Sequence, residues 1–244
     1  MSSAKVVFVS DAHFSLPVND GEVQRRASFL AFLESLYGVE RLVVAGDLFQ
    51  FWYDLGATIP KGYFDLLEGL ARLRRSGTAI DYVAGNHDFW RSSFFRDQLG
   101  VETHADVLDL RAQSRRVLVR HGDGIGPGDR GYKLLKRLLR HRVTIGAARL
   151  LHPDLLYAIA RRADRVSHAH TSRRTIDTRR LDAAAREAFD LGFDALVMGH
   201  VHTQVHKQLD GGELVVLGDW LDLFSYATLE NGAFTTARWH APAS

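Results

Sequence analysis

Residue types that bind metal ions follow five separate apolar runs of this chain. The residues are Asp11 and His13, Asp47, Asn86, His121, and His200 with His202. Because the chain has no cysteine, imidazole, carboxylate and amide groups must supply any metal site. Such donors suit Mn, Fe, Zn or Ni ions rather than Ca or Mg alone. Seven ligands exceed the needs of one tetrahedral ion but suffice for two ions, with Asp47 as the natural bridge.

Two such ions, about 3.5–4 Å apart, hold phosphoryl oxygens and activate water near neutral pH. The pattern therefore predicts hydrolysis at phosphorus. Each motif alone is a weak signal, since Gly-Asp after a strand is a common helix-capping turn and Gly-Asn is ordinary turn chemistry. Gly-His-x-His is a stronger one. Because all five motifs occur in one chain, each directly after an apolar run, their joint occurrence predicts a metal site.

The apolar runs are typical of buried β-strands, at residues 5–10, 41–45, 79–84, 116–119 and 194–198. Apolar residues with helical spacing alternate with them, over about 22–37, 61–75 and 182–191. Shorter strands are expected at 107–110, 203–208, 213–217, 225–229 and 233–239. This order predicts an α/β fold with a mostly parallel sheet, in which the strand ends bring distant residues to one edge.

The composition is that of an ordinary globular protein, with 46% hydrophobic and 25% charged residues in a chain of 244. Neither a signal peptide nor a membrane-spanning run is evident, so a cytoplasmic location is expected. The net charge of +2 is unevenly distributed. Residues 130–180 hold 14 Lys/Arg and three Asp, a net +11, which leaves −9 elsewhere. This asymmetry predicts a face or an inserted segment that meets an anionic partner.

The chain resembles the calcineurin-like metallophosphoesterases in motifs that together span residues 11 to 202: Asp11-Ala12-His13, Gly46-Asp47, Gly85-Asn86-His87-Asp88, His121 and Gly199-His200-Val201-His202. The resemblance implies an α/β (α+β) fold, a four-layer αββα sandwich with a dinuclear site. It also implies that one ion is held by Asp11, His13, Asp47 and His202, and the other by Asp47, Asn86, His121 and His200. Two divalent transition-metal ions are expected, with Mn²⁺ as the first choice and Fe, Zn or Ni as alternatives.

His87 and Asp88 are the predicted catalytic residues. His87 is expected beside the ions without ligating them, where a histidine can stabilise phosphoryl oxygens or protonate the leaving group. Asp88 is expected to orient the His87 ring, as carboxylates behind metal sites do. The alternative for His87 is an ordinary turn histidine.

Within the superfamily, the chain resembles the UDP-2,3-diacylglucosamine hydrolases in Gly46-Asp47-Leu48-Phe49, Asn86-His87-Asp88-Phe89, and His121-Gly122-Asp123 followed by Asp129 and Tyr132. Those enzymes cleave the pyrophosphate of UDP-2,3-diacylglucosamine to UMP and lipid X in lipid A synthesis. Their helical insertion forms a lid that holds the two acyl chains at the membrane surface. Two positions depart from that family: His87 stands where many members have Arg, and Gln50 stands where an acidic residue is common.

The basic segment matches such an insertion. Residues 130–174 are predicted to form a helical lid, broken near Gly146 or His152-Pro153, within a catalytic domain of residues 1–129 and 175–244. Basic residues interleave there with leucines, which is typical of a helix at a membrane surface. The residues expected to contact substrate are Asp129, Tyr132, Lys133, Lys136, Arg173 and Arg174. The expected partners are a UDP-linked glycolipid and the cytoplasmic membrane, with the protein bound peripherally to the inner membrane surface.

Other interpretations stay open at this point. The insertion is alternatively a helical hairpin packed on the domain with a solvated basic rim. A nucleic-acid surface is not expected, because the segment has few aromatic residues to stack on bases. The same site would serve a soluble phosphodiesterase or phosphatase acting on nucleotides or phosphoproteins. A non-catalytic scaffold is disfavoured, because all seven ligand positions are filled. The sequence does not predict the oligomeric state.

Overall fold

The fold is known from a computed structural model that describes residues 3–54, 58–88, 93–125, 141–148, 150–159, 162 and 178–241. The predicted substrate-contacting residues lie outside the described residues: Asp129, Tyr132, Lys133, Lys136, Arg173 and Arg174. Their roles therefore stay predictions. The same holds for most of the predicted insertion and for its boundaries with the catalytic domain.

A six-stranded sheet carries three of the five motifs. Its order is β11-β10-β1-β2-β3-β4. The strands are β1 (Ser3–Val9), β2 (Val39–Val44), β3 (Ala79–Val83), β4 (Glu102–His104), β10 (Ser225–Glu230) and β11 (Ala233–Arg238). β1 to β4 are parallel, whereas β10 and β11 are antiparallel to their neighbours. The parallel strands therefore end at one edge, where Asp11, Asp47 and Asn86 follow β1, β2 and β3.

A five-stranded sheet carries the other two motifs. Its order is β5-β6-β7-β9-β8. The strands are β5 (Val107–Ala112), β6 (Arg115–Arg120), β7 (Ala195–Met198), β8 (Gln204–Leu209) and β9 (Gly212–Leu217). The expectation of a single sheet is wrong, since the described strands form two, but five of their nine pairings are parallel, as expected. β5 turns back tightly onto β6 at Gln113 and Ser114, which both have positive φ. His121 follows β6, and His200 and His202 follow β7, so the motifs come from two sheets.

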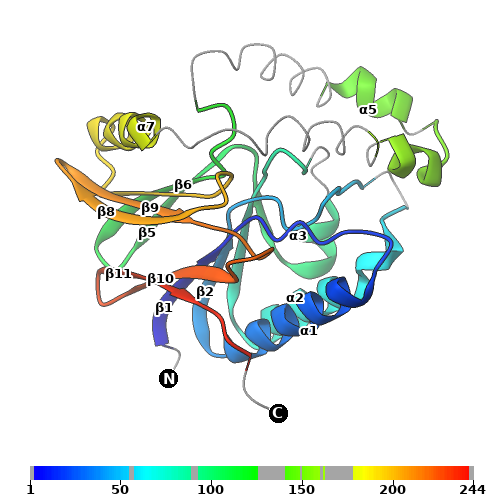
Figure 1. The fold of residues 1–244 in the computed structure, drawn as a ribbon, viewed down its shortest axis with the longest axis horizontal. Helices are drawn as coiled ribbons and strands as arrows, with labels where there is room; N and C mark the ends of the chain where they lie inside the picture. The colour runs from blue at the N-terminus through cyan, green and yellow to red at the C-terminus, as the bar shows by residue number, and fades with distance from the viewer. Residues whose placement is uncertain are drawn as a thin grey trace.

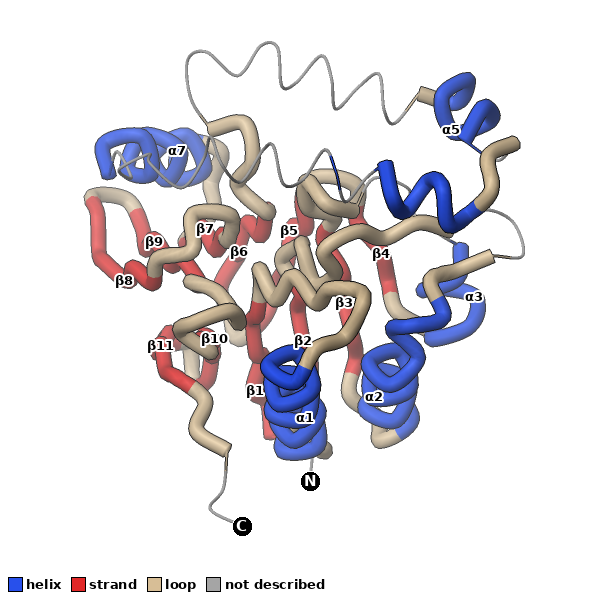
Figure 2. The backbone as a smooth tube through the Cα atoms, turned by 45° about the vertical axis from the view of Figure 1, so that its right-hand side comes forward, coloured by secondary structure: helices blue, strands red, loops and turns tan. Residues whose placement is uncertain are grey.

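Helices cover the outer faces of both sheets, which confirms the predicted four-layer αββα sandwich. Figure 1 and Figure 2 show α1 and α2 side by side against the six-stranded sheet and α7 against the five-stranded sheet. The helical elements are α1 (Asp20–Ser35), a 3-10 turn η1 (Lys61–Tyr63), α2 (Phe64–Arg75), α3 (Ser93–Leu99) and α7 (Thr178–Asp190). The first predicted helix is observed two residues earlier than predicted, η1 and α2 together fill the predicted 61–75, and the third begins four residues earlier than predicted.

Strand β1 shows why the apolar runs are continuous rather than alternating. Val7 packs in the helix-side core, whereas Val6 and Phe8 pack between the two sheets. All three side chains are fully buried, and burying each of them stabilises the fold by roughly 1.5–3 kcal/mol. A central strand buried on both faces therefore needs apolar residues at every position.

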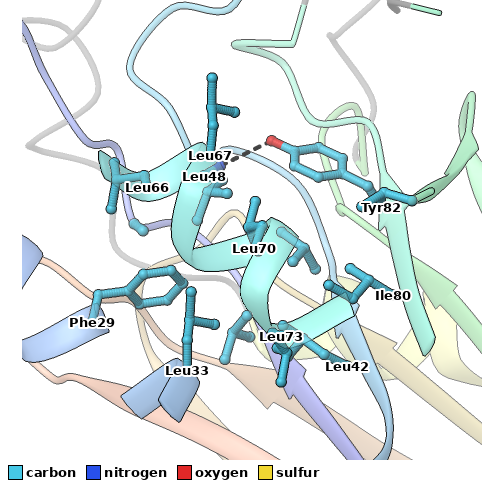
Figure 3. Packing of buried hydrophobic residues seen from close by; sticks show 14 of the residues in the cluster. Phe29, Leu33, Leu42, Leu48, Leu66, Leu67, Leu70, Leu73, Ile80 and Tyr82 are labelled. Atoms are coloured by element: carbon cyan, nitrogen blue, oxygen red, sulfur yellow. Dashed lines mark hydrogen bonds between the residues drawn. The ribbon is translucent and has the colours of Figure 1, made fainter. Parts of the chain in front are cut away.

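The helix-side core also reaches the loops that carry the site. Figure 3 shows Leu66, Leu70 and Leu73 of α2 against the sheet, with the Tyr82 hydroxyl beside Leu48. The Leu48 backbone N–H donates to that hydroxyl over 3.3 Å. This hydrogen bond ties the loop after β2 to a residue of the core.

The described part of the basic segment is helical. Helix α5 (Arg142–Ala148) is followed by helical residues 153–159, in agreement with the break predicted at His152-Pro153. Ala148 and Leu156 pack with Phe51 and Tyr53, which follow β2. None of the helices in the described ranges is both long and apolar enough to cross a membrane.

Candidate metal centre

The seven predicted ligands converge where the ends of β1, β2 and β3 meet the ends of β6 and β7. Two groups of three have ligand atoms within 4.8 Å of one another: Asp11, His13 and His202, and Asp11, Asp47 and His121. Asp11, Asp47 and His121 are at most 1% exposed. The convergence arises because parallel strands deliver their following residues to one edge, and the two sheets face each other there.

One group of donor atoms surrounds the Nε2 atom of His121. Asn86 Oδ1 lies 2.9 Å from it, Asp47 Oδ2 lies 3.1 Å away and His200 Nδ1 lies 3.2 Å away. The other ring nitrogen of His121, Nδ1, is 2.9 Å from the backbone carbonyl of Ala45. A carbonyl only accepts, so this contact places a proton on Nδ1 and leaves Nε2 as the ligand atom. The four side chains therefore present three types of donor to one point.

The second group surrounds the Oδ1 atom of Asp11. His202 Nε2 lies 3.5 Å from it, and His13 Nε2 lies 3.6 Å from it. Asp47 joins the two groups, because its Oδ2 is 3.9 Å from His13 Nε2 as well as 3.1 Å from His121 Nε2. The Asp47 carboxylate thus lies against a histidine of each group.

The backbone is left-handed at five of these seven residues. The φ angles are 53° at Asp11, 46° at His13, 54° at Asp47, 72° at His200 and 51° at His202. A non-glycine residue in this region carries strain of roughly 1–3 kcal/mol and persists only where its surroundings impose it. Strained backbone at residue after residue of one cluster is typical of a functional site.

Hydrogen bonds between the loops impose that backbone. Asp11 N–H donates to the Gly46 carbonyl over 3.1 Å, and His13 N–H donates to the Asp47 carbonyl over 2.9 Å. The loops after β1 and β2 therefore run side by side. Gly46 has a φ of 89°, and a Cβ atom there would lie 2.6 Å from His121 Nδ1. Only glycine allows this close approach of the two sheets.

Asp88 has a different set of contacts from the one the sequence suggests. Its Oδ2 accepts from the backbone N–H of Asp47 over 3.0 Å and of Gly85 over 2.8 Å, and its Oδ1 accepts from the Tyr82 hydroxyl over 2.8 Å. The His87 ring is instead positioned by the Gln50 carbonyl, 2.6 Å from its Nδ1. Both Asp88 oxygens thus hold the loops after β2 and β3 together, and the orientation of the His87 ring by Asp88 stays a prediction.

His87 lies beside the ligands, as predicted. Its backbone N–H donates to Asp47 Oδ1 over 2.8 Å, and its ring meets the His13 ring edge-on, with centroids 4.8 Å apart. Ligand atoms of His13, Asp47 and His87 all lie within 4.8 Å of one another. The ring is half-buried, so it borders both the cluster and solvent.

Opposite charges share the interior of the cluster. Burial alone would lower the pKa of His121, but the carboxylates of Asp47 and Asp11 outweigh it and raise that pKa to about 10. Burial would likewise raise the pKa of Asp47, but the charges of His121 and His87 hold it well below its ordinary value. Burial and the neighbouring His121 lower the pKa of His200 to about 4. Two carboxylates thus compete for positive charge in a buried space.

These residues fit a divalent metal centre. Asp11 Oδ1 is buried and has no hydrogen-bond partner within the part of the chain that the structure describes. A buried carboxylate oxygen in that state calls for a cation. The donor set of imidazole nitrogen with carboxylate and amide oxygen is that of transition-metal ions such as Mn, Fe, Zn or Ni. An ion would bind His121 at Nε2 only when that nitrogen carries no proton, so metal binding and the raised pKa of His121 compete.

Asp219 is a residue that the motif search missed. It follows β9, and its Oδ2 lies 3.8 Å from His202 Nδ1, on the far side of that ring from Asp11. Its Oδ1 accepts from the backbone N–H groups of Leu221, Asp222 and Leu223. At this distance the carboxylate is a charge next to the ring rather than a hydrogen-bond partner of it. A signal was present, because Val-Val-Leu-Gly-Asp at 215–219 repeats Val-Val-Ala-Gly-Asp at 43–47.

Comparison with known proteins gives consistent matches. A sequence model of the family described as calcineurin-like phosphoesterase matches residues 4–204. The UDP-2,3-diacylglucosamine hydrolase of Porphyromonas gingivalis is 26% identical in an alignment 244 positions long, and the alignment covers 92% of this chain and 93% of that protein. The UDP-2,3-diacylglucosamine hydrolase of Pseudomonas savastanoi is 31% identical over 225 residues, which cover 88% of each chain. An archaeal phosphodiesterase structure has a TM-score of 0.50 at 13% identity and covers 96% of this chain and 98% of its own, which supports the fold alone.

Proposed function

The chain belongs to the calcineurin-like phosphoesterases, which are metal-dependent hydrolases, and we propose that it cleaves UDP-2,3-diacylglucosamine. Water adds to one phosphorus of the pyrophosphate and one P–O bond of the bridge breaks, which gives UMP and lipid X. The observation that carries this proposal is the identity of 30–31% with proteins of that name over 88% of this chain and 88–90% of theirs. The alternative of a non-catalytic scaffold explains neither that similarity nor the complete ligand set.

In this proposal the seven residues hold two divalent ions, for which Mn²⁺ is the first choice. Asp11, His13, Asp47 and His202 hold one ion; Asp47, Asn86, His121 and His200 hold the other. Such ions, when bound, neutralise charge on the phosphoryl oxygens and activate the attacking water. Asp47 contacts a histidine of each group and so would be shared by both ion sites.

His87 acts on the substrate rather than on the ions. The Gln50 carbonyl accepts from Nδ1 of the ring, so Nε2 is the nitrogen that meets the phosphoryl group or the leaving oxygen. The His87 backbone N–H also holds Asp47 Oδ1, so one residue aligns both the substrate and the bridging carboxylate. Asp88 contributes by holding the loop between them.

The basic segment supports a lipid substrate. Its described helices and the turn between them expose five large apolar side chains, those of Val143, Leu150, Leu151, Leu155 and Ile159. Leu150 is 88% exposed and Val143 is 72% exposed. An apolar surface on a strongly basic segment fits acyl chains and the anionic surface of a membrane. We propose that this segment is the lid and that it binds the protein peripherally to the cytoplasmic membrane.

An activity panel tests the proposal. Purified protein with Mn²⁺ is given UDP-2,3-diacylglucosamine in mixed micelles, a soluble aromatic phosphodiester or a soluble monoester, and phosphorus NMR follows the products. The expected result is release of UMP from the lipid, with the Asp47→Ala variant inactive and still folded. Rapid hydrolysis of the soluble diester without any UMP release would instead assign the protein as a soluble phosphodiesterase.

A second measurement tests the membrane proposal separately. Flotation with vesicles of anionic phospholipid is expected to carry the protein with the lipid. Replacing Leu150, Leu155 and Ile159 by serine should reduce flotation and lipid turnover, and it should leave turnover of the soluble diester unchanged. Equal flotation of both proteins would refute the role of these side chains.

A further inference from the structure

We propose that Arg25 is a positioning residue for the ion site formed by Asp11, His13, Asp47 and His202. It joins two loops that carry or support these ligands. Arg25 lies on α1, outside every motif, and its guanidinium reaches the backbone behind the metal centre. It donates through NH1 to the carbonyls of Ala12 and Trp220, the latter over 3.4 Å, and through NH2 to the carbonyl of His13 over 3.2 Å. The inference rests on the proposed dinuclear site and adds to it a residue that none of the motifs contains.

The three carbonyls belong to two separate loops. Ala12 and His13 follow β1, and Trp220 follows β9, next to Asp219. The Trp220 N–H also donates to the Asp11 carbonyl over 3.1 Å, so Arg25 closes a contact that already exists between the loops. A planar guanidinium offers several donors in a fixed geometry, and a lysine cannot span such a set.

The clamped loops hold the ligands of one ion. The loop after β1 carries Asp11 and His13, both in left-handed conformations that need support from outside. The loop after β9 carries Asp219, which lies behind the His202 ring. Arg25 therefore acts on His13 directly through its carbonyl and on His202 through Asp219. None of its contacts described above involves Asn86, His121 or His200, the ligands of the other ion.

The guanidinium is itself held in place. Glu22, which is 5% exposed, pairs with Arg25 and accepts from the Ser15 N–H over 2.8 Å. The Arg25 guanidinium also lies over the Phe14 ring, 4.6 Å from its centroid. Such a preorganised group fixes the backbone at a small entropic cost. The side chain is only 11% exposed, so it is a buried clamp rather than a surface ion pair.

The neighbouring Arg26 provides a matched control. It shares Glu22 with Arg25, over 3.1 Å, and its side chain is 5% exposed, against 11% for Arg25. It also donates to the Gly62 carbonyl, the Ser15 carbonyl and Asp65, and its guanidinium lies over the Tyr63 ring. None of these four residues is a predicted metal ligand. Losing Arg26 should therefore destabilise the fold without a preference for either ion.

Titration of the metal-free protein with Mn²⁺, followed by electron paramagnetic resonance of the free ion, tests the inference. His202→Ala and His200→Ala identify which binding class belongs to which site. Arg25→Met and Arg25→Lys are expected to lower the Mn²⁺ affinity of the class of sites that His202→Ala removes, by roughly 10–100-fold. The Mn²⁺ affinity of the other class should stay unchanged. Arg26→Met should lower the thermal stability and leave both classes unchanged.

The inference is overturned if the Arg25 variants weaken both classes equally, weaken neither, or regain full affinity with lysine. A wild-type protein that lacks two Mn²⁺ classes would overturn the dinuclear proposal itself, and the inference with it. Because the readout is metal affinity, the result does not depend on which phosphoester is the substrate.

Discussion

Replacing Gly85 by alanine tests whether Asp47 must stay where the structure places it. A Cβ atom at Gly85 would lie 2.7 Å from Asp47 Cγ and 2.8 Å from Asp47 N, and closer still to Oδ1. An ordinary contact is about 3.4 Å, so the carboxylate must move by about 0.7 Å at Cγ and by more at Oδ1. The 2.8 Å contact is with a backbone atom, so the loop must shift as well, against the bonds from Gly85 N–H and Asp47 N–H to Asp88 that hold it in place.

The displaced carboxylate is the one that both ion sites share. A misplacement of about 1 Å at a reacting centre can lower the rate about 100-fold, and we expect a loss of that size in kcat. Affinity for Mn²⁺ should fall at both sites, unlike the result expected for Arg25. Overpacking should lower the free energy of unfolding by roughly 1–3 kcal/mol, which leaves the protein folded at room temperature.

Three measurements decide the outcome: hydrolysis of a soluble diester, Mn²⁺ stoichiometry and urea unfolding. Gly21→Ala is the control, because a Cβ there meets only Asn19 Oδ1, at an ordinary 3.6 Å. A folded Gly85→Ala variant with wild-type kcat and two bound ions would refute the argument that Gly85 is small to make room for Asp47.

Two further predictions concern groups outside the metal centre. Burial alone would raise the pKa of Asp81, but its bonds to His104 and Arg41 hold the pKa below the ordinary value. Its stabilisation is therefore complete above the unfolded pKa of about 3.9 and is lost as the pH falls through the folded value. Asp81→Asn should lower the free energy of unfolding by roughly 1–3 kcal/mol at pH 7, and urea titrations should show the difference from wild type shrinking as the pH falls below about 4. The exposed Asp97→Asn should show little change at either pH. The Tyr157 hydroxyl bonds to both the N–H and the carbonyl of Leu16, so Tyr157→Phe should loosen residues 153–159 and reduce kcat/KM for the lipid more than for the soluble diester. Tyr37→Phe, at an exposed position, is the control, and an equal effect on both substrates would contradict an anchoring role for Tyr157.

The sequence predicted those helices and strands that have a clear apolar pattern and end at a recognisable turn residue. The runs before Asp11, Asp47 and Asn86 are buried on both faces, so their apolar residues are continuous and easily found. Helix α3 and strand β4 were not predicted, because seven and three residues are too short to show a period. The assignment of all motifs to one sheet failed because strand periodicity says nothing about which strands pair.

The same limit explains which parts of the site a motif search finds. Asp11, His13 and Asp47 would bind metal through their side chains, so their residue types alone indicate metal binding. The orientation of His87 depends on a backbone carbonyl of Gln50, which any residue at that position would offer. Asp219 lies between these cases, since its Val-Val-Leu-Gly-Asp context repeats that of Asp47 and marks it as a strand-end carboxylate.

Arg25 is the extreme case, because its partners in the metal loops are all backbone carbonyls. Substituting Ala12 or Trp220 would leave those carbonyls in place, so no pair of residue types in the sequence points to the contact. The contact depends on residue type only at Arg25, whose guanidinium supplies the donors. An arginine on a helix is ordinarily a solvated surface residue, so its type gives no signal. The strained backbone of Asp11 and His13 nevertheless requires some group to hold it. A search that starts from strained ligand backbone and asks what holds each carbonyl would therefore find such residues where a search for side-chain motifs does not.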